Sequence, residues 1–193
     1  MRIIGGRWKG RRLAVPPVPG LRPTPDRVRE TLFNWLAPAL PGARCLDLFA
    51  GSGALGLEAL SRGAAEAVLV ERHPAALRCL REAVDRLGAR AEVVAADART
   101  FLRRCREPFD LVFLDPPYGS RLLAPCLHLL AEGGWLRPGG WLYLEGAWAG
   151  APEGPPLPAG YALHRRGHAG AVGYWLARRL DPGGGDDSGG TMG

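Results

Sequence analysis

The residues best suited to chemistry are four in a row, Asp115-Pro116-Pro117-Tyr118, which follow the apolar run Leu111–Leu114. A strand of an open α/β sheet would deliver such a segment to the carboxyl edge, where ligands of these folds bind. The two prolines fix two φ angles and remove two backbone donors, which leaves the nearby carbonyls as stiff acceptors. Asp115 and a proline carbonyl could therefore accept both N–H groups of a planar exocyclic amine, while the ring of Tyr118 stacks on the base that carries it. The alternative is an ordinary strand-to-loop turn.

A glycine-rich turn follows the first predicted strand. Gly51, Gly53 and Gly56 have the spacing G-x-G-x-x-G, and the acid Glu71 stands at the end of the next predicted strand. Glycine lets the backbone approach a ligand closely and adopt angles that a side chain would forbid. The same pattern is the fingerprint of dinucleotide binding, so these residues alone leave a nicotinamide cofactor open.

Two further acids favour S-adenosylmethionine. Asp47 precedes the glycine turn, where it could meet a cationic amino-acid group directly or through water, and Asp97 ends the third predicted strand. In this assignment Glu71 binds the ribose hydroxyls, and Asp97 with Ala98 contacts the adenine. Asp47 could instead cap the turn internally, and Asp97 could be a helix N-cap. The predicted cofactor-binding residues of this region are Asp47, Phe49, Gly51, Ser52, Gly53, Glu71, Arg72, Asp97 and Ala98.

The elements that must position these residues alternate between strands and helices. The predicted strands are 45–49, 67–70, 91–96, 111–114 and 141–144, and the predicted helices are 54–62, 74–87, 98–104 and 122–136. Such alternation is typical of an α/β fold with a parallel sheet and right-handed crossovers. Two more predicted strands, 161–166 and 172–178, flank a short turn and indicate an antiparallel hairpin at one edge of the sheet.

The N-terminal segment predicts a small β-hairpin, because Arg2–Ile4 and Arg12–Val15 flank a glycine-rich turn. A proline-rich stretch at 16–23 is typical of a stiff linker. Thr24 is predicted to cap a helix that has Pro25 at its first position. The predicted organisation is a basic hairpin and linker (1–23), an α/β domain (24–180) and a Gly-rich tail (181–193), which we expect to be disordered.

Positive charge is concentrated near the N-terminus. Residues 1–30 hold eight basic and two acidic residues, so this segment carries the same net charge of +6 as the whole chain. A concentrated cationic segment favours a polyanionic partner such as nucleic acid, and a merely solvated surface is the alternative. We expect deletion of the N-terminal arm (residues 1–15) to weaken RNA binding and flatten its salt dependence, and to leave cofactor affinity nearly intact. The predicted RNA-binding residues are Arg2, Arg7, Lys9, Arg11, Arg12 and Arg22.

Composition argues against several classes of protein. The chain of 193 residues is globular, with 47% hydrophobic residues, and no apolar run approaches the roughly 20 residues of a membrane span. We see no long apolar segment of a signal peptide near the N-terminus and expect a cytoplasmic protein. The cysteines predict small buried residues rather than a disulfide or zinc site, and the histidines form no metal pattern. The cysteines are Cys45, Cys79, Cys105 and Cys126.

The chain resembles the Rossmann-like class I methyltransferases that use S-adenosylmethionine. Among them it is similar to the bacterial family that methylates guanine N2 in the 16S ribosomal RNA of the small subunit. The resemblance covers roughly residues 1–180 and is carried by the following segments: Arg2-Ile3-Ile4-Gly5-Gly6, Gly10-Arg11, Arg22-Pro23-Thr24, Arg27-Val28-Arg29-Glu30, Leu46 to Gly56, Glu58 to Ala64, and Asp115 to Tyr118.

This resemblance implies a seven-stranded, mostly parallel sheet whose last strand is antiparallel. It implies that Thr24 and Glu30 lie near the methionine end of the cofactor, and that Asp115, Pro116, Pro117 and Tyr118 form the catalytic corner. The implied target is the family equivalent of guanine 966, in 16S ribosomal RNA or in an assembled small subunit. We expect a monomer that needs no metal. The acidic, glycine-rich tail departs from the family pattern.

Other functions stay open at this point. A DNA adenine-N6 or cytosine-N4 methyltransferase would use the same corner, although a chain of this length has no additional target-recognition segment. A glutamine side-chain methyltransferase would require Asn in place of Asp115. A nicotinamide-dependent dehydrogenase leaves Asp115–Tyr118 without a role. A non-catalytic RNA-binding assembly factor would not need the complete set of cofactor residues.

Overall fold

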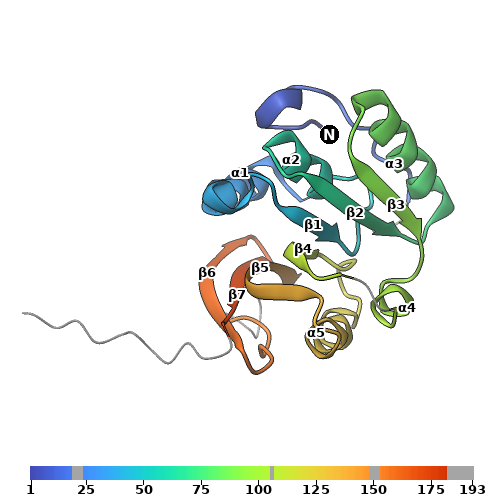
Figure 1. Ribbon diagram of the computed structural model, residues 1–193. Coiled ribbons are helices and arrows are strands. Elements are labelled where there is room, and N and C mark those ends of the chain that lie inside the picture. Colours follow the sequence, from blue (N-terminus) through green and yellow to red (C-terminus); the bar gives the residue numbers. More distant parts are fainter. Residues whose placement is uncertain (19–23, 105–106, 148–152, 182–193) are drawn as a thin grey trace, which may run out of the picture.

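A seven-stranded sheet forms the centre of the computed structural model, which describes residues 1–18, 24–104, 107–147 and 153–181 (Figure 1). The strands are β1 (Arg44–Asp47), β2 (Glu66–Glu71), β3 (Ala91–Ala95), β4 (Phe109–Leu114), β5 (Leu136–Ala147), β6 (Tyr161–Ala169) and β7 (Val172–Arg179). Their order across the sheet is β3-β2-β1-β4-β5-β7-β6. β1 to β5 pair in parallel, and β7 runs antiparallel to both neighbours. The predicted sheet with an antiparallel last strand is confirmed.

Helices cover both faces of this sheet (Figure 1). They are α1 (Asp26–Leu36), α2 (Gly56–Ser61), α3 (Pro74–Leu87), α4 (Ala98–Leu102) and α5 (Leu123–Glu132), with short 3-10 helices η1 (Gly6–Trp8) and η2 (Ala37–Ala39). α1, α2 and α3 pack into one apolar core, and α4 and α5 pack into the other. Within the described ranges, no helix has the length and apolar character that crossing a membrane requires.

The strand sequences explain the two cores. Successive residues of a strand point to opposite faces, so a strand covered on both sides is apolar throughout. In β4, Leu111 and Phe113 lie in the core with α1 to α3, whereas Val112 and Leu114 lie in the core with α4 and α5. The continuous apolar run that precedes Asp115 is therefore the signature of a central strand.

The topology brings the ends of β1 and β4 together. The chain builds β1, β2 and β3 toward one edge and then returns to place β4 on the other side of β1. Ligands of such sheets bind at this switch point, beyond the carboxyl ends of the strands. Asp47, the last residue of β1, is paired in register with Phe113 of β4, and Asp115 stands two residues further on. The fold thus places both predicted acids at the ligand-binding edge.

Some predicted boundaries were wrong. The predicted helix 122–136 ends at Glu132, because Gly133 and Gly134 follow it and Gly134 has a φ of 64°. Leu136 is instead the first residue of β5, which is 12 residues long and extends well beyond the predicted strand 141–144.

The two segments of the N-terminal arm pair in antiparallel fashion, as predicted, through backbone hydrogen bonds such as those from Ile3 to Arg11 and from Leu13 to Met1, but they form no regular strands. The arm has one isolated antiparallel bridge, between Arg2 and Arg12, and the short helix η1 between them. Ile3 and Leu13 are 1% and 3% exposed and belong to the core of α1, α2 and α3. Deleting the arm would expose this core and destabilise the domain, and the predicted effect of the deletion on RNA binding stays a prediction. The predicted boundary at residue 23, Arg22 and the tail after residue 181 lie outside the described residues.

The cysteines behave as small packed residues. Cys45 and Cys126 are buried, Cys79 is half-buried, and all of these carry free thiols, whereas Cys105 lies outside the described residues. In the described part of the chain, no group of three or more His, Cys, Asp or Glu side chains could hold a metal ion.

Candidate active site

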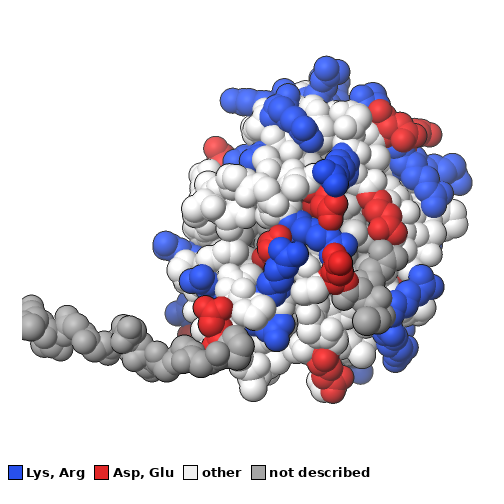
Figure 2. Space-filling model, viewed as in Figure 1, with Lys and Arg blue, Asp and Glu red and all other residues white. Residues whose placement is uncertain are grey.

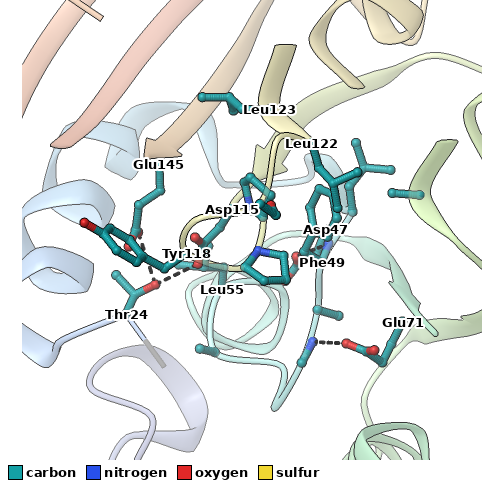
Figure 3. Close-up of a pocket in the computed structure, with 18 of the residues that line it drawn as sticks. Thr24, Asp47, Phe49, Leu55, Glu71, Asp115, Tyr118, Leu122, Leu123 and Glu145 are labelled. Atoms are coloured by element: carbon teal, nitrogen blue, oxygen red, sulfur yellow. Dashed lines mark hydrogen bonds between the residues drawn. The ribbon is translucent and has the colours of Figure 1, made fainter. Parts of the chain in front are cut away.

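A cavity of about 1230 Å³ lies beyond the carboxyl ends of β1 to β5 (Figure 3). Its walls are the last residues of these strands and the segments that follow them, together with Thr24 and Pro25 from the entry to α1 and with Val18, Ala171 and Val172. The lining acids are Asp47, Glu71, Asp97, Asp115 and Glu145, and the basic lining residues are Arg72 and His73. The described wall is therefore strongly acidic and suits a cationic ligand.

Asp47 braces the glycine turn from inside. Its Oδ2 accepts a hydrogen bond from the amide of Gly56 at 3.1 Å and its Oδ1 one from the amide of Phe49 at 3.4 Å. The internal turn cap is thus confirmed, and the same side chain also lines the cavity. Burial raises the pKa of Asp47 to about 7, the charge of Glu71 adds to the increase, and the two amides oppose it.

The glycine turn offers no cradle for a pyrophosphate at its three glycines. The amide of Gly51 donates to Glu71 at 2.9 Å, that of Gly53 to the Ala50 carbonyl at 2.6 Å, and that of Gly56 to Asp47. Dinucleotide sites need such amides to face the phosphates. The G-x-G-x-x-G spacing therefore serves turn geometry here, which argues against the dehydrogenase alternative.

Gly53 shapes the turn and does not line the cavity. Its φ is 80°, and a Cβ at this position would lie 2.6 Å from Cδ1 of Leu57. Gly53 therefore has a structural role in the turn, and its contact with the cofactor stays a prediction.

Glu71 joins the ends of β1 and β2. Its Oε2 accepts from Gly51, and its Oε1 accepts from the amides of Arg72 and His73 at 2.7 Å each. A carboxylate has about four lone-pair positions, so these three bonds leave capacity for a ligand hydroxyl.

Asp97 is the N-cap of α4, which was the alternative role considered for this residue. Its Oδ1 accepts from the amide of Arg99 at 3.0 Å, and its Oδ2 lies 3.5 Å from Nη1 of Arg72. Asp97, Ala98 and Arg72 all line the cavity, so the cap also fixes the far wall of the site.

The corner after β4 contains a cluster that the sequence did not reveal. The hydroxyl of Thr24 lies 3.2 Å from Oδ2 of Asp115 and 3.3 Å from Oε2 of Glu145 (Figure 3). The hydroxyl of Tyr143 donates to the same Oε2 of Glu145 at 2.8 Å. Thr24 is used here rather than as a helix cap: α1 begins after Pro25, with no side-chain cap. The predicted cap by Thr24 was wrong.

The electrostatics of the corner follow from burial. Burial raises the pKa of Asp115 well above its ordinary value, the carboxylates of Glu145 and Asp47 raise it further, and the bond from Thr24 opposes this. Burial also raises the pKa of Glu145, against the hydrogen bonds from Tyr143 and Thr24. Two carboxylates this close in a buried site do not both ionise readily. Tyr118, in contrast, is 68% exposed and presents its ring at the cavity wall.

Not every predicted site residue reaches the cavity. Glu30 is exposed on α1 and does not line the cavity, so the placement near the cofactor is corrected. Its neighbour Arg29 points inward, because the periodicity of α1 turns that position toward the core. The other predicted cofactor residues, apart from Gly53, all line the cavity: Thr24, Asp47, Phe49, Gly51, Ser52, Glu71, Arg72, Asp97 and Ala98.

The predicted RNA-binding side chains that the structure describes do not line the cavity. Figure 2 shows Lys and Arg side chains gathered at the top of the molecule, where Figure 1 places the N-terminal arm. Arg7, Lys9, Arg11 and Arg12 are exposed, and Arg7 lies over the ring of Trp8 at 4.2 Å. Arg2 is exposed as well and pairs with Asp26 at 3.3 Å.

A buried ion pair ties the arm to the site. Glu58 accepts hydrogen bonds from the amides of Ile4 and Gly5 at 2.9 and 2.8 Å, and its Oε2 lies 3.3 Å from Nη1 of Arg29. Arg29 in turn donates through Nε to the carbonyl of Thr24 at 3.2 Å. These contacts connect the arm, through Glu58 on α2 and Arg29 on α1, to Thr24 beside Asp115.

The sequence contained one signal for Glu145 that went unused. Glu145 directly follows the predicted strand 141–144, as Asp115 follows 111–114. Parallel strands end at the same edge of a sheet, so an acid after the fifth strand belongs beside an acid after the fourth. Arg29 and Glu58 carried no such signal, because a buried charge on a helix resembles a surface charge until its partner is known.

The sheet order, the antiparallel β7 and the cavity at the carboxyl ends of the strands define a Rossmann-like class I methyltransferase fold. The chain belongs to the family described as Conserved hypothetical protein 95, whose model matches residues 1–178.

Named relatives support this membership. "Ribosomal RNA small subunit methyltransferase D" of Escherichia coli K12 is 50% identical over 181 residues, covering 93% of this chain and 90% of the relative. The protein of the same name in Haemophilus influenzae is 40% identical over 183 residues, covering 91% and 92%. The solved structure of Escherichia coli yhhF has 50% identity and a TM-score of 0.84, covering 93% of this chain and 98% of that one.

Proposed function

We propose that this protein transfers a methyl group from S-adenosylmethionine to the exocyclic N2 of a guanine in 16S ribosomal RNA, at the family equivalent of guanine 966. The observation that carries the proposal is that Asp115-Pro116-Pro117-Tyr118 opens into the same cavity as the acids that end β1 and β2 and the acid that follows β3. One site thus combines a place for a cationic nucleoside with a place for a planar amine. The names of the Escherichia coli and Haemophilus influenzae relatives support the ribosomal RNA substrate.

The lining residues fit S-adenosylmethionine by their chemistry. The acidic wall suits a ligand with a sulfonium and an ammonium group, and the glycine amides of the turn are already bonded within the protein. Asp47 would hold the amino-acid end, Glu71 the ribose, and Asp97 with Ala98 the adenine. Phe49 and Leu122 supply apolar contact within the same wall. When bound, the cofactor supplies an electrophilic methyl group on sulfur.

The corner residues would hold the target amine. The lone pair of a guanine N2 is delocalised into the ring, which makes the amine a weak nucleophile. Asp115 and the carbonyl of Pro116 would accept its two N–H bonds and fix the nitrogen in line for attack, and such positioning can contribute on the order of 7–11 kcal/mol at best. The exposed ring of Tyr118 would stack on the flipped base. The arm would contact RNA phosphates without reading sequence.

Replacing Asp115 tests this assignment. We expect Asp115→Ala to bind S-adenosylmethionine with an affinity within about threefold of the wild-type value. Its turnover with undermethylated small subunits should fall by about 10²-fold or more. The matched control is Asp110→Ala, at the opposite end of β4, where the carboxylate pairs with Arg137 at 2.7 Å. A wild-type rate in Asp115→Ala would refute the role of the corner.

A further inference from the structure

The hydroxyl of Thr24 stands between two carboxylates, and its hydrogen-bonding capacity restricts their protonation. Oγ1 lies 3.2 Å from Asp115 and 3.3 Å from Glu145 (Figure 3). A hydroxyl carries one proton and can donate to one acceptor at a time. Both contacts can be hydrogen bonds together only if one carboxyl holds a proton and donates it to Oγ1.

The surroundings reinforce this arrangement. Among the described residues, the titratable and charged groups that face the pair are Asp47 from β1, Tyr143 from β5, Tyr174 opposite Glu145 on β7, and Arg29 behind Thr24. Arg29 directs its bonds to the Thr24 carbonyl, to Glu58, to Asp26 and to the Arg2 carbonyl. Among the described residues, Arg29 is the cation behind Thr24, and its ion pairs go to Asp26 and Glu58. Protonation of one carboxyl reduces the charge of the pair.

We propose, resting on the function proposed above, that Glu145 and Thr24 are positioning residues that share one proton with Asp115. This arrangement keeps Asp115 directed at the target amine and able to take the proton that the amine releases. Glu145 acts through Thr24 and does not itself contact the reacting nitrogen.

The proposed reaction is a methyl transfer to N2 followed by a proton transfer to Asp115. The lone pair of N2 forms the bond to the methyl carbon, while the bond between that carbon and sulfur breaks and leaves its electron pair on sulfur. One N–H proton then passes to Asp115, and its bonding pair stays on nitrogen. The carboxyl pair thereby changes from one negative charge to none, which burial favours. The proton leaves to water once the product has left the cavity.

Three variants isolate this cluster. Glu145→Gln keeps the shape and removes the charge, Thr24→Val removes the hydroxyl, and Thr24→Ser restores it. Glu66→Gln is the control, because Glu66 begins β2 at the opposite edge of the sheet and pairs with Arg44. The side-chain 13C resonance of Asp115 is followed against pH in ligand-free protein, and kcat against pH is measured with small subunits.

The expected shifts have opposite signs. Glu145→Gln should lower the titration midpoint of Asp115 by about one pH unit or more, because a negative neighbour is gone, and move the acidic limb of kcat by the same amount. Thr24→Val should raise that midpoint and lower kcat about tenfold or more, and Thr24→Ser should recover both. The KM for RNA and the affinity for S-adenosylmethionine should stay within about threefold of the wild-type values in all variants. The reason is that the cluster acts on the chemical step and not on the binding of either substrate.

An unchanged Asp115 midpoint in Glu145→Gln would overturn the inference. So would a loss of cofactor affinity in Glu145→Gln without a shift of Asp115, because Glu145 would then be a cofactor ligand. The two proposals can also fail separately. If the wild-type protein methylates no RNA, the proposed function and the catalytic part of this inference are overturned. The titration of Asp115 in ligand-free protein would still show whether it shares a proton with Glu145.

Discussion

The guanidinium of Arg29 and the carboxylate of Glu58 form an ion pair in which both side chains are 0% exposed, with Nη1 and Oε2 3.3 Å apart. Around this pair converge the amides of Ile4 and Gly5, the Arg62 side chain and the Thr24 carbonyl. The pair therefore holds the arm, α1 and α2 together and fixes the backbone beside the candidate active site.

Breaking this pair should destabilise the whole domain. Glu58→Gln removes the buried counter-charge of Arg29 and leaves the exposed Asp26, at 2.5 Å, as its remaining carboxylate partner. The loss should therefore be at most about 3–5 kcal/mol, which is what an uncompensated buried charge costs. The free energy of unfolding in urea measures the loss. Glu66→Gln, which breaks the more exposed pair with Arg44, should cost less than about 1 kcal/mol. Equal losses in the two variants would show that the buried pair has no special role.

The arm should be tested by charge rather than by deletion, because Ile3 and Leu13 belong to the core. Replacing exposed Lys9 and Arg11 with Gln should weaken RNA binding and flatten its dependence on salt by about 0.7 in logarithmic slope for each lost phosphate contact. Affinity for S-adenosylmethionine should stay unchanged, because neither side chain lines the cavity.

A second pair of arginines provides the control for the arm. Arg103 and Arg104 are exposed and follow α4, which leads away from the carboxyl edge of the sheet. Their replacement with Gln removes the same charge. If this control flattens the salt dependence as much as the arm variant does, RNA binding by the arm is excluded as the specific cause.

Asp47 should make stability depend on pH. Its pKa is about 7 in the folded protein and about 3.9 when unfolded. Well below pH 4 the group is protonated in both states, and as pH rises from about 4 toward 7 the unfolded chain loses this proton first. The wild type should therefore lose stability relative to Asp47→Asn, by at most about 1.4 kcal/mol per pH unit across that range. Urea unfolding of both proteins from pH 4 to 7 tests this, and parallel curves would contradict it.

The sequence predicted the sheet because each central strand carries its own evidence. An apolar run bounded by turn residues, such as Leu111–Leu114, is buried on both faces whatever its neighbours are, so β4 could be placed without knowledge of the rest. Asp115 followed from this placement, because the end of a parallel strand determines which edge of the sheet a residue reaches.

The missed features depend on partners that are distant in the chain. Thr24 has a hydrophilic side chain before a helix, and local rules make it a cap. Its actual partners are 91 and 121 residues away, one directly after β4 and the other on β5. Glu30 and Arg29 are adjacent charges on α1, and only the packing against Glu58 decides which of the two is buried. Such choices are made by tertiary structure and not by local pattern.

The nucleoside that receives the methyl group distinguishes methylation of guanine N2 in ribosomal RNA from the alternative reactions. The protein is incubated with methyl-labelled S-adenosylmethionine and, in parallel, with undermethylated small subunits, naked 16S ribosomal RNA and duplex DNA, and each product is digested to nucleosides. The account predicts label in N2-methylguanosine from the RNA or the subunits. Label in N6-methyladenine or N4-methylcytosine from DNA, or no label in any substrate, would contradict it.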